Sequence, residues 1–195
     1  MKRILYWGLF GFTVAIYVTM LGWSLPTVSA AAGGLAPFDM RPSGYSYSEA
    51  VAFLSALSDD GASFYLQVQQ VLDIFYPGLL ALTLFFAIVA LLPSRWGQWR
   101  RLPAAAALPV AIFDYIENHA VAAMITAGAN DVTPELVASA SQWTVLKSLS
   151  SMVAMSTMLV LLIIHAIRIT IRLLLRQPSR RPHRSNAAMP EGVQA

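Results

Sequence analysis

Four apolar runs constrain the fold of this chain more than any other feature. They cover residues 4–25, 66–92, 102–127 and 143–167, and three of them carry almost no charge. Each run has roughly 20 residues or more, enough to cross a hydrocarbon core of about 30 Å at about 1.5 Å per helical residue. Because backbone groups find no water partners in lipid, we expect each run to be a helix. Short connections then predict an all-α, integral-membrane, up-down four-helix bundle.

Composition agrees with a membrane protein. Hydrophobic residues make up 57% of the 195 residues and charged residues 12%, whereas soluble domains average about 45–50% and about 25%. The length suits one domain, which we expect to span residues 1–176, with a disordered basic cytoplasmic tail at 177–195. Cysteine is absent, which excludes disulfides and thiolate chemistry.

The distribution of Lys and Arg predicts the orientation. Basic residues precede the first run, fill the 93–101 connection and come after the fourth run, whereas the other two connections carry only Arg41. The positive-inside rule therefore predicts a multi-pass protein of the bacterial inner membrane with both termini in the cytoplasm. The tail is expected to contact membrane lipids, and no nucleic acid is expected as a partner.

The first run raises the alternative of a cleaved signal peptide. Val28-Ser29-Ala30 resembles a cleavage site, but the apolar cores of signal peptides have about 7–15 residues. This run is longer and carries Trp7 and Trp23 near its ends, as interfacial anchors do. We therefore expect a retained helix.

The connection at 26–63 is the longest. Its start is rich in Gly, Pro and Ser and is predicted to be irregular. Ser46 and Glu49 then form a capping-box pattern ahead of a short amphipathic helix, which Gly61 is expected to end. This extracytoplasmic helix is expected to lie on the membrane surface or cap the bundle, either as a seal or as a lid over a site.

Polar residues interrupt the third run at DYIENH, where Asp114, Glu117 and Asn118 share one helix face and His119 points elsewhere. The second run carries several polar residues on one broad helix face. The fourth run carries Lys147 together with small residues on one face of its own helix. In the second run Pro77 leaves the carbonyl of Asp73 without its helical partner. The candidate ligand-binding residues are Asp73, Asp114, Glu117, Asn118, Lys147, Tyr76, Gln70 and Ser151.

Ionisable groups facing lipid cost several kcal/mol each, so these faces should meet in the interior. Three acids against one lysine then require protonated acids or an additional cation. The leading interpretation is a buried acidic site, in the periplasmic half of the bundle, that binds a cation or the head group of an amphiphile. The alternatives are a non-enzymatic scaffold or assembly subunit, whose polar cluster only joins helices, and an intramembrane enzyme. The sequence does not decide whether the chain forms a homo-oligomer or binds another membrane protein.

These interpretations differ in what they predict. The binding interpretation predicts a polar cavity of several hundred Å³, and a scaffold predicts a closed interior. No cofactor is expected. No metal site is expected either, because Glu117 and His119 diverge on the helix. Lys147 and Ser151 have the spacing of a serine–lysine dyad, but no oxyanion-hole pattern accompanies them.

Several segments together resemble a family of small, uncharacterised bacterial membrane proteins with four transmembrane helices. The markers are Gly44-Tyr45, an acid with an aromatic residue and Pro soon after it at DIFYP, the DYIEN segment, and a lysine early in the last helix. The resemblance covers most of residues 33–150. It implies the four-helix bundle and adds nothing about the chemistry.

Overall fold

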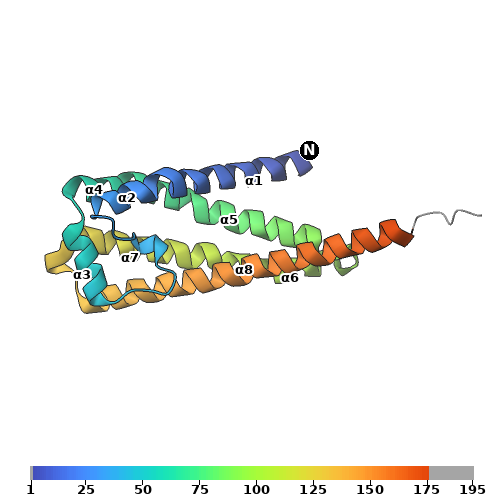
Figure 1. Cartoon of the computed structure of the whole chain (residues 1–195). Helices are drawn as coiled ribbons and strands as arrows, with labels where there is room; N and C mark the ends of the chain where they lie inside the picture. The colour runs from blue at the N-terminus through green and yellow to red at the C-terminus, as the bar shows by residue number, and fades with distance from the viewer. Residues whose placement is uncertain (1, 176–195) are drawn as a thin grey trace, which may run out of the picture.

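The computed structural model describes residues 2–175, which are helical apart from short connections and include no strand (Figure 1). Three continuous helical segments are long and apolar enough to cross a membrane: 3–31, 59–91 and 134–175. The predicted all-α class is therefore confirmed, and the chain has the helices of a membrane protein. The tail predicted at 177–195 lies outside the described residues.

The first segment joins α1 (Lys2–Thr19), a π-helical turn η1 (Met20–Ser24) and α2 (Leu25–Ala31). The prediction of irregular chain from Pro26 was therefore wrong. Pro26 lies in the first turn of α2, where a missing N–H is tolerated. The irregular connection begins only after Ala31 and contains one short 3-10 turn, η2 (Phe38–Met40).

The short amphipathic helix forms as predicted. α3 (Tyr47–Ala56) begins with a capping box in which Ser46 and Glu49 satisfy each other's backbone N–H groups. These hydrogen bonds, first the one from the Ser46 hydroxyl, lower the pKa of the exposed Glu49 carboxyl. The buried face of α3 packs against α7 and α8, so α3 covers one end of the molecule (Figure 1).

Gly61 does not end this helix. It lies buried inside α4 (Asp59–Phe64), which continues through the π-helical turn η3 (Tyr65–Gln69) into α5 (Gln70–Leu91). A Cβ at Gly61 would lie 2.5 Å from the Cβ of Ala31. Gly61 is therefore needed for the close approach of α4 to α2, which a sequence pattern cannot show.

Two 3-10 turns and a short helix connect α5 to α7: η4 (Ser94–Arg100), α6 (Arg101–Ala104) and η5 (Ala105–Ala107). The last two helices are α7 (Leu108–Asp131) and α8 (Pro134–Leu175). We predicted a connection at 128–142, but only Val132 and Thr133 separate the two helices. α7 is not among the three membrane-length segments, because its own polar residues interrupt its apolar run.

The long helices alternate in direction, and α5 packs against α1, α7 and α8 (Figure 1). We call the end formed by α2, α3, α4 and the α7–α8 connection the capped end. The opposite end, formed by the start of α1, η4 and the end of α8, is the open end. Both ends of the described chain lie at the open end. The largest cluster of buried hydrophobic residues lies at the capped end and includes Phe38, Phe53 and Tyr65.

Candidate functional site

Lys147 lies at the centre of a buried polar network near the capped end. Its Nζ lies 2.9 Å from Glu117 Oε2, 3.3 Å from Asp114 Oδ1 and 3.4 Å from Asp39 Oδ1. Among residues 2–175 these are the salt bridges that the structure contains. The side chains are buried: Glu117 is 0% exposed, Asp114 7%, Asp39 8% and Lys147 14%. We call Asp39, Asp73, Asp114 and Glu117 the acidic cluster.

Asp39 reaches this network from the irregular connection, which folds into the bundle. Phe38 is fully buried and packs edge-to-face against Phe53. The guanidinium of Arg41 donates to the carbonyl of Ala36 at 2.8 and 3.0 Å and lies over the Phe38 ring. Tyr65 donates its hydroxyl to Asp39 Oδ2 at 2.5 Å. The connection is therefore held on both sides of Asp39.

Gly44 and Tyr45 fix the far end of the same connection against α8. Gly44 has φ +83°, and a Cβ there would lie 2.6 Å from Ser141 Oγ. The backbone N–H of Tyr45 donates to that same oxygen at 2.8 Å. Only glycine combines this left-handed conformation with so close an approach.

Asp73 belongs to the same electrostatic environment as Asp39, Lys147 and Asp114, and a relay of side chains links it to η1, the π-helical turn that follows α1. Gln69 Nε2 donates to both carboxylate oxygens of Asp73 at 3.0 and 3.2 Å. Ser24 in turn donates to Gln69 Oε1 at 2.6 Å. Gln69 ends one π-helical turn and Ser24 ends the other, so both irregular turns direct polar groups into this relay.

The carbonyl that Pro77 leaves without a helical partner finds one across the bundle. Asn118 Nδ2 donates to the carbonyl of Asp73 at 3.3 Å. One residue on, Tyr115 donates its hydroxyl to the carbonyl of Ile74 at 2.9 Å, and a Cβ on Gly78 would lie 2.8 Å from that hydroxyl. The DYIEN segment thus completes the hydrogen bonds of the kinked helix α5 and at the same time supplies two carboxylates.

Charge is unbalanced in this network. Asp39, Asp73, Asp114 and Glu117 are four carboxyl groups, and Lys147 is one ammonium group, so full ionisation leaves three negative charges in excess. Thr144 donates to Glu117 Oε1 at 2.8 Å, which stabilises that carboxylate but adds no positive charge. Carboxylates that surround one ammonium group in a weakly polar interior repel one another strongly.

One polar atom beside the acidic cluster has no partner. The Tyr45 hydroxyl is buried and makes no hydrogen bond within the described part of the chain. It lies towards Thr144, without the geometry of a hydrogen bond, and near Glu117 and Asp39. Burial, reinforced by these two acids, raises the pKa of the Tyr45 phenol. A neutral hydroxyl, able to donate and accept, therefore faces the acids.

The structure brings together most of the predicted site residues. Asp73, Asp114, Glu117, Asn118 and Lys147 meet as described above, and Gln70 donates to the carbonyl of Asn118 at 2.9 Å. Tyr76 stacks on Tyr17 of α1 and shares the electrostatic environment of Asp114 and Lys147. Ser151 makes no side-chain hydrogen bond among residues 2–175, and His119 is exposed as expected. The role of these residues in binding stays a prediction.

Sequence reasoning missed part of the site. It did not select Asp39, Gln69, Ser24, Thr144 or Tyr45 as site residues. Asp39 lies in a segment that is polar and irregular in sequence, where an acid is normally solvated. Its neighbour Phe38, between Pro37 and the acid, was the available signal, because a large aromatic residue in such a segment often anchors it to a core.

Five of the larger cavities among the described residues lie away from the acidic cluster. Their volumes are about 360–620 Å³, and none is lined by a member of the acidic cluster. None of these five is therefore the polar cavity that the binding interpretation predicted at the acids. No group of three or more potential ligands with metal-binding geometry occurs within the described range either.

Fold and site together define an all-helical protein with membrane-length helices and a buried acidic cluster around one lysine. Comparison with family models, with curated proteins and with solved structures finds no match. The resemblance to the small bacterial family with four transmembrane helices therefore stays a prediction.

Proposed function

We propose that the chain is a multi-pass inner-membrane protein whose acidic cluster binds a small cation, with the proton as the simplest case. The observation that carries this proposal is the ratio of four carboxyl groups to one ammonium in a nearly closed interior. An excess of buried negative charge is removed either by protonation or by a bound cation. Reversible loss or gain of that cation is then a natural activity of the site.

The proposed topology has four crossings: the three membrane-length segments and α7. Asp114 and Glu117 reduce the hydropathy of α7, but both side chains are buried against α8 rather than exposed to lipid. Arginines gather at the open end, so the positive-inside rule places that end, with both termini, in the cytoplasm. The acidic cluster then lies in the periplasmic half.

A small cation is favoured over an amphiphile. A head group needs a cavity, and none of the five cavities reaches the acids. A proton needs only a carboxylate, and a small ion needs a few oxygen atoms. The unpartnered Tyr45 hydroxyl supplies one further oxygen beside the acids.

The test combines infrared spectroscopy with thermal melts of the full chain in detergent. We expect a band of protonated carboxyl groups at neutral pH that shrinks in Asp114→Asn, or a melting temperature that rises with Na⁺ or K⁺ against choline at equal ionic strength. Asp131→Asn is the matched control, because Asp131 is an exposed acid at the capped end. A cluster without protonated carboxyls and without a response to either cation would overturn the proposal.

A scaffold function is the second candidate, and the closed interior favours it. Apart from Tyr45, the buried side-chain polar atoms within residues 3–175 all have hydrogen-bond partners. Such a network can serve only to join helices. Tyr45→Phe separates the two functions. A scaffold should be unchanged or slightly stabilised by losing an unpaired hydroxyl, whereas a cation site should lose part of its Na⁺, K⁺ or pH response.

A further inference from the structure

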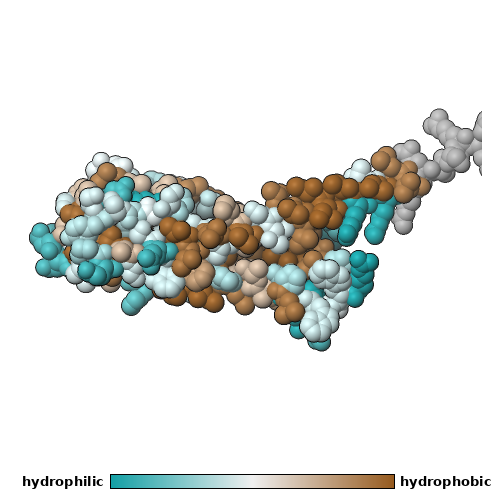
Figure 2. All heavy atoms as spheres, turned by 90° about the horizontal axis from the view of Figure 1, so that it is seen from below, coloured by the Kyte–Doolittle hydropathy of each residue, from teal (hydrophilic) through white to brown (hydrophobic). Residues whose placement is uncertain are grey.

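A cavity of about 540 Å³ at the open end is lined by four arginines. Arg95 and Arg100 come from η4, and Arg168 and Arg172 lie one turn apart on α8. Ser94 and His165 line the same cavity. Figure 2 shows hydrophilic groups on the protruding part of α8 and on the nearby loop facing each other across a notch. Two separate elements therefore direct guanidinium groups into one space.

Within residues 2–175 these arginines form no ion pair with an acid. The sequence contains no Asp or Glu between 74 and 113 or between 136 and 190, and the salt bridges of the described residues all involve Lys147. Four guanidinium groups in one cavity repel each other unless an anion lies between them. Guanidinium groups bind phosphate oxygens through pairs of parallel hydrogen bonds, so phosphate is the anion that this geometry suits.

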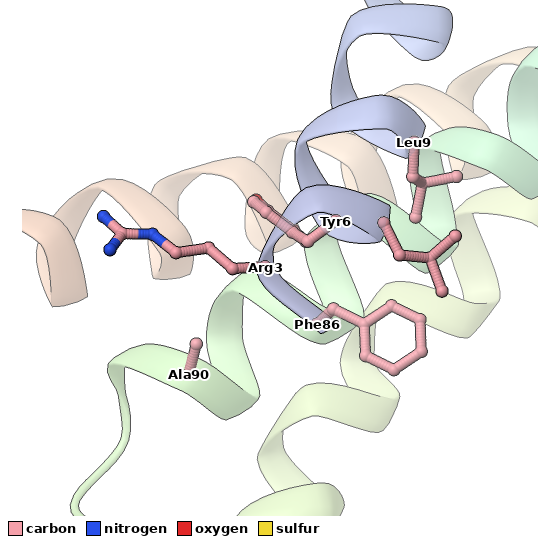
Figure 3. A pocket seen from close by; sticks show the side chains of 6 residues that line it. Arg3, Tyr6, Leu9, Phe86 and Ala90 are labelled. Carbon is pink, nitrogen blue, oxygen red and sulfur yellow. The ribbon is translucent and has the colours of Figure 1, made fainter. Parts of the chain in front are cut away.

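An apolar groove adjoins this cavity. It has a volume of about 620 Å³ and is lined by Leu5, Tyr6 and Leu9 of α1 and Phe86 of α5, with Arg3 at its edge. Ala90 lines both the groove and the arginine cavity. In Figure 3 the guanidinium of Arg3 lies on the Ala90 side of the groove, away from the Phe86 ring. A molecule with a phosphate at one end and a hydrocarbon chain at the other would match both spaces.

We propose that the open end binds an anionic phospholipid, with its head-group phosphate among Arg95, Arg100, Arg168 and Arg172 and an acyl chain in the groove between α1 and α5. Charge complementarity selects an anionic lipid over a zwitterionic one, because a zwitterionic head group would bring its own cation into a cavity that is already basic. The proposal rests on the proposed insertion into a bilayer and is independent of the acidic cluster.

The experiment measures which lipid the purified full chain retains. The protein is equilibrated in mixed micelles with equal amounts of dioleoylphosphatidylglycerol and dioleoylphosphatidylcholine, and retained lipids are counted by native mass spectrometry. We expect a preference for phosphatidylglycerol that falls by about fivefold in Arg168→Gln and again in Arg168→Gln/Arg172→Gln. Arg101→Gln is the matched control, because Arg101 is an exposed arginine next to Arg100 that lines neither space.

Two further arms test the source of the phosphate and the role of the groove. Inorganic phosphate in excess should not displace the lipid. If it does, or if Arg101→Gln lowers the preference as much as Arg168→Gln, the site is a general anion surface and the proposal fails. Ala90→Phe changes no charge and should reduce lipid retention, because the larger side chain would fill the junction of the two spaces. Unchanged retention would contradict the proposal that an acyl chain lies in the groove.

Failure of membrane insertion can be distinguished from failure of the lipid site. A chain that does not incorporate into phosphatidylcholine vesicles would contradict the proposed membrane placement. A chain that incorporates but melts at the same temperature with and without phosphatidylglycerol would contradict only the lipid site.

Discussion

The two ends of the molecule are built from similarly apolar helices but differ in packing. At the capped end, 15 buried hydrophobic residues form one cluster. Polar side chains from η1, η3, α5, α7, α8 and the connection at 32–46 form hydrogen bonds and salt bridges with one another there. At the open end, buried residues form small clusters of three or four, and two cavities of more than 500 Å³ adjoin. Hydrophobicity alone therefore does not decide how closely these helices pack.

Polar partners explain the difference. Polar side chains towards the capped end donate hydrogen bonds to backbone carbonyls of neighbouring helices. Asn118 donates to the carbonyl of Asp73, and Tyr115 donates to the carbonyl of Ile74. Each such bond fixes the rotation and register of a helix in a way that apolar contacts do not. The arginines of the open end form no ion pair within residues 2–175, so no such pair joins α8 to η4. Substitutions at the two ends can test this contrast.

The largest effect is expected for Lys147→Met, which removes the ammonium group shared by the three described salt bridges. Leaving buried carboxylates unpaired costs about 3–5 kcal/mol of unfolding free energy. The acids escape part of this cost by protonation, so stability should partly recover near about pH 5. Glu117→Gln should rescue best, because Glu117 is closest to Lys147, ahead of Asp114→Asn and Asp73→Asn.

Thermal melts in detergent at neutral pH and about pH 5 measure this effect. Gln142→Met is the control, because Gln142 is exposed on the same helix. If Lys147→Met melts like the wild type at both pH values, the lysine does not neutralise the cluster. The contrast between the two ends would then not depend on charge pairing.

A smaller effect is expected from one added methyl group. Gly61→Ala places a Cβ 2.5 Å from the Cβ of Ala31 at the capped end, and overpacking of this kind costs about 1–3 kcal/mol. Gly8→Ala, near the open end of α1, meets nothing within 4 Å and should be neutral or slightly stabilising, because alanine is the better helix former. Equal melting temperatures for the two variants would show that the capped end is not tightly packed.

Sequence periodicity predicted the features that arise from repeating patterns. It located the three membrane-length segments and α7, the capping box of α3, and the shared face of Asp114, Glu117 and Asn118. Pro77 also correctly indicated a free carbonyl at Asp73. These features depend on neighbours within one helix, so a single sequence contains them.

Periodicity could not predict contacts that depend on distant segments. Gly61 looks like a helix end, but its role comes from Ala31, about 30 residues away. Asp39 looks solvated, and becomes buried only because Phe38 and Tyr65 draw the connection inward. The predicted site also included Gln70, whereas Gln69 is the residue that contacts Asp73. In this case the spacing of four residues was visible in the sequence.

The smallest effect is expected from the capping box, which lies on the exposed surface of the capped end. Ser46 donates its hydroxyl and its N–H to Glu49 Oε2 at 2.6 and 2.7 Å, and these bonds lower the pKa of Glu49 in the folded state. A depressed folded pKa contributes stability that is present above the unfolded pKa and is lost as pH falls through the folded pKa. Glu49→Gln keeps a capping side chain but cannot titrate. The wild type should therefore melt slightly above Glu49→Gln at neutral pH, and the difference should vanish below about pH 4. Because the two proteins differ only at residue 49, contributions from the rest of the chain cancel in this difference. A difference that stays constant from neutral pH to about pH 3 would show that the carboxylate itself does not stabilise α3, and that the capped end depends on its buried network alone.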